Sequence, residues 1–220
     1  KNLDMQKYIL VIVTLFSVIY INGQTKNTTI DFIDIENGVN FSSFDFSNSD
    51  SSTSFINGKY SPKQHYAIKV GKELKRDVSL IIGGAFDQHQ IVGAKIDSLN
   101  THYSYDLNYL SYGLELQYSK EVSTNLEFIA NAGVSMNHLL SGFQNIGSLT
   151  YDLSETQFQD ISGSVNYGVS LLYNHSETMD LYIKYNTLLN GSTFEAEDST
   201  ETYFINSRCL SLGARFSITK

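Results

Sequence analysis

Apolar and polar side chains alternate strictly along residues 109–119, YLSYGLELQYS. One face carries Leu110, Tyr112, Leu114, Leu116 and Tyr118, and the other carries Ser111, Gly113, Glu115 and Gln117. A soluble, half-buried strand turns such an apolar face into its core, whereas an outer-membrane barrel turns it out into lipid. The alternation therefore predicts a strand but leaves open which face is the inside.

The same period of two recurs in seven more segments, which gives about eight strands in total. These segments are residues 33–42, 66–74, 78–86, 126–136, 161–173, 181–189 and 210–218. Short connections at 75–77, 120–125 and 174–180 alternate with long polar ones at 48–64, 88–104, 138–160 and 190–202. Tight periplasmic turns and long extracellular loops are typical of transmembrane barrels, and ends on one side require an even strand number. We therefore predict an all-β fold, an eight-stranded antiparallel up-and-down transmembrane β-barrel.

The faces opposite the apolar ones carry glycine, serine and isolated ions. Side chains fill the interior of an eight-stranded barrel, and a buried charge must be paired. We therefore predict an internal, structural ion network, with Arg215 as the first choice of partner for Glu115. Its members are Lys69, Glu115, Glu127, Lys184 and Arg215. The alternative is a soluble barrel that carries these charges on a solvated surface.

Composition supports one all-β unit and excludes some partners. The chain has 15 Tyr, 13 Phe and a single Pro, so little interrupts ladders of strands. The formal net charge of -8, without a basic stripe, argues against a nucleic-acid partner. Cys209 is the only cysteine, which rules out an intramolecular disulfide and a cysteine metal cluster, and it is expected to be a small interior filler.

The first residues predict an export signal. Lys7 precedes an apolar run at residues 8–21, which is followed by Asn22, Gly23 and Gln24. Spanning a membrane takes about 20 apolar residues, so this shorter run favours a cleavable helical signal peptide over a membrane anchor. We expect residues 1–23 to be the signal peptide with upstream residues, and residues 24–220 to be a barrel domain in the bacterial outer membrane.

A search for chemistry yields weak candidates. None of the five histidines lies at ligand spacing from another His or from Cys, so no metal site is predicted. His102 and Ser104 in THYSYD resemble the His-x-Ser arrangement of outer-membrane lipid A deacylases, which implies an acyl hydrolase as the alternative. A divalent-cation site is the second candidate, in an acidic loop carrying Glu195, Glu197, Asp198 and Glu201, whose ordinary interpretation is a solvated loop. The glycines of IIGGAF lie inside a predicted strand and do not form a phosphate-binding loop.

Three stretches carry a family resemblance: GVNFSSF at residues 38–44, the hairpin YLSYGLELQYSKEVSTNLEFIANAGVSM at 109–136, and LSLGARFSI at 210–218. With them the chain resembles the small outer-membrane β-barrel proteins of the Bacteroidetes type, often grouped as an outer-membrane protein β-barrel or PorT-like family. The resemblance implies an eight-stranded outer-membrane barrel and no particular activity or cofactor.

The expected function follows from the predicted fold. We expect a non-enzymatic, porin-like barrel with a filled lumen, because eight strands leave no aqueous channel. It would act through long extracellular loops, or as an accessory of a surface complex. Its partners would be outer-membrane lipid and other envelope proteins. Besides the acyl hydrolase, a periplasmic soluble β-barrel that binds a small apolar ligand remains an alternative.

Overall fold

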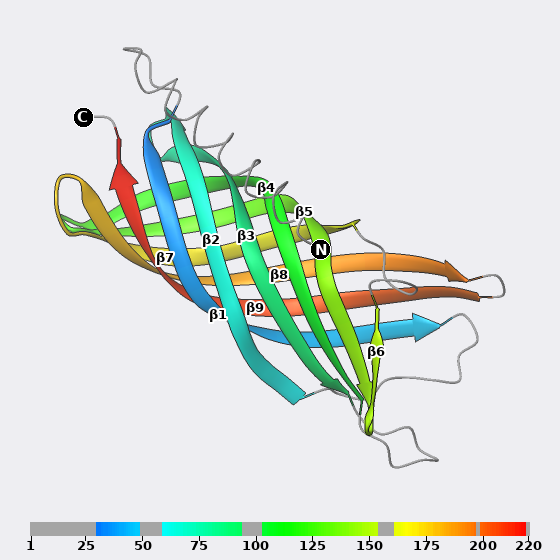
Figure 1. Ribbon diagram of the computed structural model, residues 1–220. Coiled ribbons are helices and arrows are strands. Elements are labelled where there is room, and N and C mark those ends of the chain that lie inside the picture. The colour runs from blue at the N-terminus through cyan, green and yellow to red at the C-terminus, as the bar shows by residue number, and fades with distance from the viewer. Residues whose placement is uncertain (1–29, 49–58, 94–102, 154–160, 197–198, 219–220) are drawn as a thin grey trace, which may run out of the picture.

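The computed structural model describes residues 30–48, 59–93, 103–153, 161–196 and 199–218, which form nine antiparallel strands (Figure 1). In chain order these are β1 (Phe32–Asn48), β2 (Lys59–Lys75), β3 (Val78–Gly93), β4 (Tyr103–Ser123), β5 (Leu126–Ile146), β6 (Leu149–Asp152), β7 (Ile161–Asn174), β8 (Met179–Ala196) and β9 (Ser199–Ser217). Among these residues no helix has the length and apolar character needed to cross a membrane.

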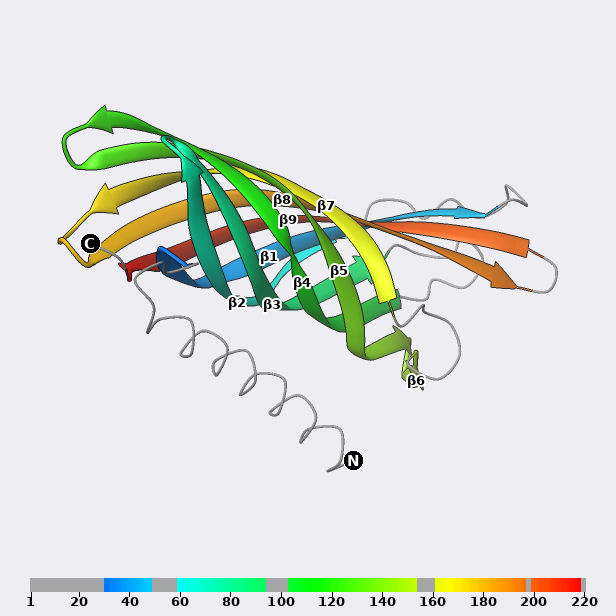
Figure 2. The same cartoon turned by 90° about the horizontal axis from the view of Figure 1, so that it is seen from above.

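Eight of the strands close into a barrel. The sheet order is β4-β3-β2-β1-β9-β8-β7-β5-β6, and the further pairing of β4 with β5 joins the two sides (Figure 2). β5 pairs directly with β7 over most of its length, so β6 is a short extra strand on the last residues of β5. The predicted eight-stranded antiparallel barrel is therefore confirmed, whereas the signal peptide at residues 1–23 lies outside the described residues.

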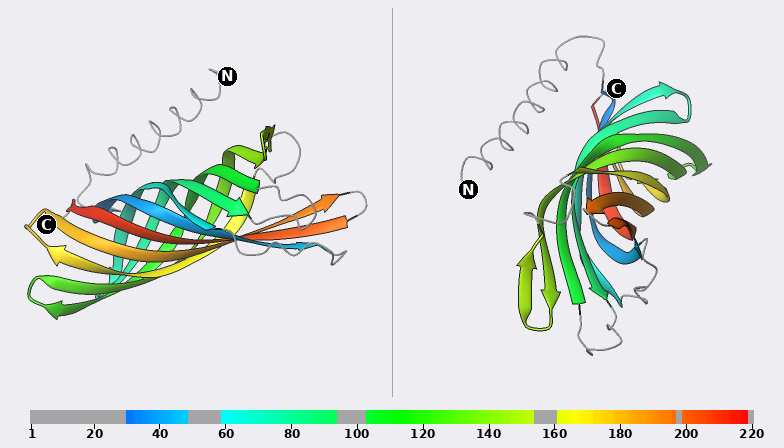
Figure 3. Two further views of the ribbon diagram at one scale, coloured as in Figure 1. Left: turned by 90° about the horizontal axis from the view of Figure 1, so that it is seen from below. Right: turned by 90° about the vertical axis from the view of Figure 1, so that its right-hand side faces the viewer.

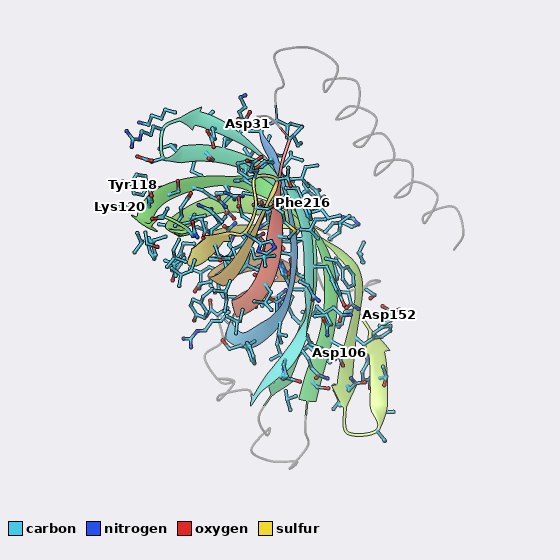
Figure 4. The ribbon with its side chains drawn as sticks, turned by 90° about the vertical axis from the view of Figure 1, so that its left-hand side faces the viewer. Asp31, Asp106, Tyr118, Lys120, Asp152 and Phe216 are labelled. Carbon is cyan, nitrogen blue, oxygen red and sulfur yellow. The ribbon has the colours of Figure 1, made fainter. Side chains whose placement is uncertain are left out.

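The barrel has two unlike ends. β1 begins beside the last residues of β9, with Phe32 opposite Ser217, and we call this side the near end. The tight turns between β2 and β3, β4 and β5, and β7 and β8 lie there too. Figure 4 places Asp31, Tyr118, Lys120 and Phe216 toward this end, and Asp106 and Asp152 toward the opposite, far end.

The alternating faces are arranged inside out compared with a soluble barrel. Leu114 is 48% exposed on the outer surface, while its neighbour Glu115 is 7% exposed and points into the lumen. The same holds around the wall, where outward apolar residues include Ile35, Ile68, Ile82, Val134, Val165, Ile183 and Leu212. The inward residues between them include Glu36, Ser111, Asn131, Ser164, Lys184 and Ser211, all buried. Residues 109–119 thus turn their apolar face away from the interior of the barrel.

This outward apolar surface forms a belt of limited height. On β4 it runs over residues 110–118, from Leu110 to Tyr118. Exposed Lys120 lies beyond its near-end edge, and Asn108 lies beyond its far-end edge. A tilted strand needs about 9–11 residues to cross a bilayer core, and residues 110–118 match that length.

The strands are longer than the alternation predicts. β3 continues to Gly93 and β4 begins at Tyr103, so most of the loop predicted at 88–104 is strand. β6 lies inside the predicted loop at 138–160, and β8 and β9 are separated by only two residues, 197 and 198. The prediction of long far-end loops is wrong for these segments. On β4 the apolar residues change from the outward to the inward face between Leu110 and Tyr109, while the backbone ladder continues.

Toward the far end the wall divides into two sheets. Pairing of β1 with β2 stops at Phe41 opposite Pro62, while pairing of β1 with β9 continues to Asn48 opposite Glu201. Proline lacks the N–H that would continue the ladder. The ends of β8, β9 and β1 form one ribbon, and those of β2 to β6 form the other sheet (Figures 1 and 3).

Apolar layers lie on both sides of the polar lumen. Toward the far end, buried side chains of the sheet formed by β2 to β6 pack against β9. They are Ile91, Leu107, Tyr109, Leu139, Leu153 and Ile205. The chain after β6 is held there by the backbone N–H of Leu153, which donates to the carbonyl of Gly142 at 2.9 Å. Toward the near end, Ile129, Leu172 and Tyr182 form a smaller cluster.

Gly113 lies at a tightly packed position of the lumen wall. It faces inward between Gly83 and Ser135, and a Cβ added there would lie 2.7 Å from the Ser135 Cβ. Gly163 faces outward, and a Cβ added there would meet nothing within 4 Å.

We therefore expect Gly113→Ala to lower the free energy of unfolding by about 1–3 kcal/mol through overpacking. Gly163→Ala, the matched control, should be neutral or slightly stabilising, because it reduces only the freedom of the unfolded chain. Urea titrations of both variants in lipid vesicles measure the difference. Equal unfolding midpoints for the two variants would argue against the close packing of the lumen.

Candidate functional site: the charged interior of the barrel

Four charges from four strands meet in the lumen. The ammonium of Lys184 on β8 lies 3.0 Å from Glu115 Oε1 on β4 and 3.7 Å from Glu36 Oε1 on β1. Lys69 on β2 lies 2.9 Å from the same Glu36 oxygen and 3.7 Å from Glu115 Oε2. Two carboxylates therefore alternate with two ammonium groups, so the square of charges is neutral as a whole.

The registers of the strands explain why these long side chains fit. Lys69 lies opposite Gly83, which in turn lies opposite Gly113. Glu115 has Gly133 as its cross-strand neighbour on β5. Glycine at these inward positions leaves the volume that the lysine and glutamate side chains occupy.

A second ion pair lies toward the near end and is joined to the first group. Arg215 on β9 donates to both carboxylate oxygens of Asp34 on β1, from Nε and Nη2 at 2.8 Å each. Its guanidinium carbon lies 3.8 Å from the centre of the Phe32 ring. Gln117 connects the two groups, because its Oε1 accepts from Arg215 Nη2 at 2.9 Å and its Nε2 donates to Glu115 Oε1 at 2.7 Å.

A third group continues toward the far end. Asp87 on β3 lies 2.7 Å from Nδ1 of His65 and accepts hydrogen bonds from Asn40 Nδ2 at 2.9 Å and Ser111 Oγ at 3.0 Å. The other ring nitrogen of His65 lies 3.6 Å from Glu36 Oε2, which links this group to the central square. Both ring nitrogens thus face carboxylates, an arrangement that suits a doubly protonated imidazolium.

A group of three polar side chains lies beyond Asp87 toward the far end. Ser42 Oγ is 2.7 Å from His89 Nδ1 and 3.2 Å from Ser207 Oγ, and all three side chains are buried. The buried polar groups of the lumen thus extend along the barrel from Arg215 to this histidine. The hydrogen bonds and ion pairs of these groups hold their side chains in fixed positions.

The sequence prediction names part of this network. The structure brings Lys69, Glu115 and Lys184 together, while Arg215 reaches Glu115 only through Gln117. The expected direct pairing of Glu115 with Arg215 is wrong, because Asp34 lies opposite Arg215 across the β1–β9 ladder. No ion pair joins Glu127 to a described cation, and this residue lies partly exposed beside the near-end turn, where water can solvate it.

Sequence reasoning missed the two acidic residues of β1 and the pair formed by His65 and Asp87. Asp34 and Glu36 occupy the non-apolar face of the first predicted strand, so a strict application of the alternation identifies both as inward. His65 and Asp87 fall just outside the segments predicted as strands. There the sequence pattern is too weak to assign a face.

A small cavity adjoins the network. Its volume is about 90 Å³, and its lining includes His65, Lys69, Asp87, Glu115 and Asn166. A water molecule takes about 30 Å³ in the liquid, so the cavity has room for a few waters against these polar walls. Apolar clusters lie toward both ends of this part of the lumen.

The other sequence candidates gain no support as a reactive site. His102, Glu197 and Asp198 lie outside the described residues, as do the side chains of Glu195 and Glu201. Ser104 accepts a hydrogen bond from Asn145 Nδ2 at 3.2 Å. Among the described residues no group of three or more His, Cys, Asp or Glu side chains could hold a metal ion, and Cys209 is a buried free thiol.

Comparison with known proteins places the fold. No protein-family model and no curated protein matches the chain. Among solved structures, Neisserial surface protein A is similar with a TM-score of 0.50 and 14% identity, over 84% of this chain and 95% of that one. The outer-membrane protein OprG from Pseudomonas aeruginosa is similar with a TM-score of 0.50 and 13% identity, over 86% of this chain and 97% of that one. Both likenesses concern the fold alone, that of a small outer-membrane β-barrel.

Proposed function

We propose that this chain is an integral protein of the bacterial outer membrane, a small barrel that is closed to solutes and works through the β-structure of its far end. The observation that carries the proposal is the inverted wall, with an outward apolar belt around a buried, paired set of charges. A soluble protein rarely exposes so large a continuous apolar surface, whereas a lipid bilayer requires one. The near end, with its tight turns, faces the periplasm in this proposal.

The lumen has a structural role in this proposal. Every member of the central square has an oppositely charged partner within 4 Å, and apolar layers lie toward both ends. Eight strands enclose an interior just wide enough for side chains. The barrel therefore holds the far-end sheets in place and transports nothing through its centre.

The far-end sheets are the part that reaches other molecules. β4 and β5 each have 21 residues, about twice what a membrane crossing needs. Their remaining residues form a rigid platform above the belt, which would present the connecting segments to the cell's surroundings or to a surface complex. We keep membership in the Bacteroidetes-type family and export by a signal peptide at residues 1–23 as parts of this proposal, supported by the sequence motifs alone.

Membrane fractionation combined with a gel-mobility assay tests the proposal. We expect the protein in the outer-membrane fraction, with an unheated sample that migrates differently from a boiled one, because a closed barrel resists unfolding by detergent in the cold. A boiled aliquot of each fraction is the control. A protein found in the soluble fraction, with one mobility before and after boiling, would sink the proposal.

A further inference from the structure

A ladder of polar side chains crosses the outer surface of β3, β4 and β5 directly above the belt, that is, on its far-end side. Gln88 Nε2 donates to Asn108 Oδ1 at 3.0 Å, and Asn108 Nδ2 donates to Ser141 Oγ at 2.8 Å. The hydrogen bonds run from strand to strand, so the two amides are held in one orientation. Each of these side chains is only partly buried.

The ladder faces away from the interior. The residues that alternate with its members are buried beneath the sheet, namely His89, Leu107, Tyr109 and Leu139. A bulge between β4 and β5, after Asn108, keeps Ser141 on the same side as the amides. The ladder therefore continues the face that carries the apolar belt below it.

Two further rows extend this polar face toward the far end. In the first, Ser61 Oγ donates to Gln90 Oε1 at 2.7 Å, and Lys63 pairs with Asp106 at 3.2 Å. The Phe143 side chain, opposite Asp106, is 39% exposed. In the second row, Asn145 donates to Ser104, and Thr150 donates to Asn145 at 2.8 Å.

The height of this face determines what lies next to it in the proposed membrane. The ladder is two residues beyond Phe86 on β3 and Leu110 on β4, the positions at which the continuous apolar run of the outward face ends on those strands. If the belt meets acyl chains, the layer directly above it meets lipid headgroups. In the outer leaflet of an outer membrane these headgroups are phosphorylated sugars.

The chemistry of the face fits the sugar part of such headgroups. Primary amides and hydroxyls both donate and accept, as sugar hydroxyls do, and each amide has more donors and acceptors than the ladder uses. An exposed aromatic ring beside them offers an apolar plane for the C–H face of a sugar. Lys63 is already paired with Asp106, so the face has little net charge to attract phosphate.

We infer that the outward polar face of β3, β4 and β5 is a docking surface for the sugar headgroups of surrounding outer-leaflet glycolipids. The inference rests on the proposed function, because it requires the belt to lie in the outer membrane. It also names a first partner for the platform on the far-end side of the belt, namely the glycolipids that surround it.

The test compares vesicles of stated composition. Wild-type protein and the double variant Gln88→Leu with Asn108→Leu are folded into phosphatidylcholine vesicles, alone or containing lipopolysaccharide or phosphatidylglycerol. Thr187→Val, an outward hydroxyl on β8 away from this face, is the matched control. We expect lipopolysaccharide to raise the urea midpoint of the wild type and of Thr187→Val, and the double variant to lose more than half of that increase.

Three outcomes would overturn the inference. The double variant could keep the full increase, phosphatidylglycerol could raise the wild-type midpoint as much as lipopolysaccharide does, or lipopolysaccharide could leave the wild type unchanged. As a second readout, side-chain amide resonances of Gln88 and Asn108 should shift with lipopolysaccharide, while those of the buried Gln117 and Asn131 stay in place. Failure of the wild type to insert into any vesicle would instead disprove the proposed function, so the two failures are distinguishable.

Discussion

Replacement of Lys184 by methionine lowers the free energy of unfolding by about 3–5 kcal/mol, because it leaves a buried carboxylate without its nearest cation. Lys184 is fully buried and approaches both oxygens of Glu115 at 3.0 Å. Lys69 remains, but it lies 3.7 Å from Glu115 and already bonds Glu36. Methionine has a similar volume, so the loss reports the charge more than the packing.

Urea unfolding in phospholipid vesicles, followed by cold gel mobility, measures this change. Lys63→Met is the matched control, since Lys63 pairs with Asp106 at 3.2 Å where both side chains are partly exposed, and such pairs are worth about 0–1 kcal/mol. The double variant Lys184→Met with Glu115→Leu should recover most of the loss, because it removes both buried charges. Equal losses for Lys184→Met and Lys63→Met would mean that Glu115 is solvated and the lumen is wet.

Arginine in place of Leu114 should cost about 2–4 kcal/mol of stability in a bilayer, the penalty for a charge facing lipid near the midplane. Leu114 lies outward at the middle of the belt on β4. The same substitution on an exposed position of a soluble barrel stays within about 0.5 kcal/mol. The size of the loss therefore measures whether the outward face meets lipid or water.

Leu149→Arg provides the control for the Leu114 experiment. Leu149 is 58% exposed on β6, well beyond the belt, and we expect its replacement to change stability by less than about 0.5 kcal/mol. Both variants are compared by urea titration in vesicles of the same lipid. A negligible effect at both positions would contradict a lipid-facing belt.

The sequence predicts the belt well because alternation is a direct consequence of it. Along residues 110–118 the outward face is apolar and the lumen face is polar, so the polarity of each residue indicates which way its side chain points. Beyond Asn108 the outward face of β4 is polar while Leu107 and Tyr105 pack inward, so the apolar face changes sides although the hydrogen-bonded ladder continues to Tyr103. The sequence therefore locates the part of each strand that carries the belt and misses its extension toward the far end.

The ion partners are harder to predict for a different reason. Alternation indicates that Glu115 and Arg215 face inward, but the stagger between strands determines which inward groups share a level. In this barrel the stagger places Asp34 opposite Arg215 and brings Lys184 to Glu115. Those neighbours come from strands distant in the chain, and no local pattern encodes them.

The pair of Asp34 and Arg215 also bears on how the chain assembles. These residues are 181 positions apart and lie on the first and last strands, so they meet only when β1 and β9 join. Until that seam forms, a hairpin inserted alone would carry an uncompensated carboxylate or guanidinium into the acyl chains. In the proposed membrane location this penalises stable insertion of single hairpins, and the pair favours closure of the barrel and membrane entry in one concerted step.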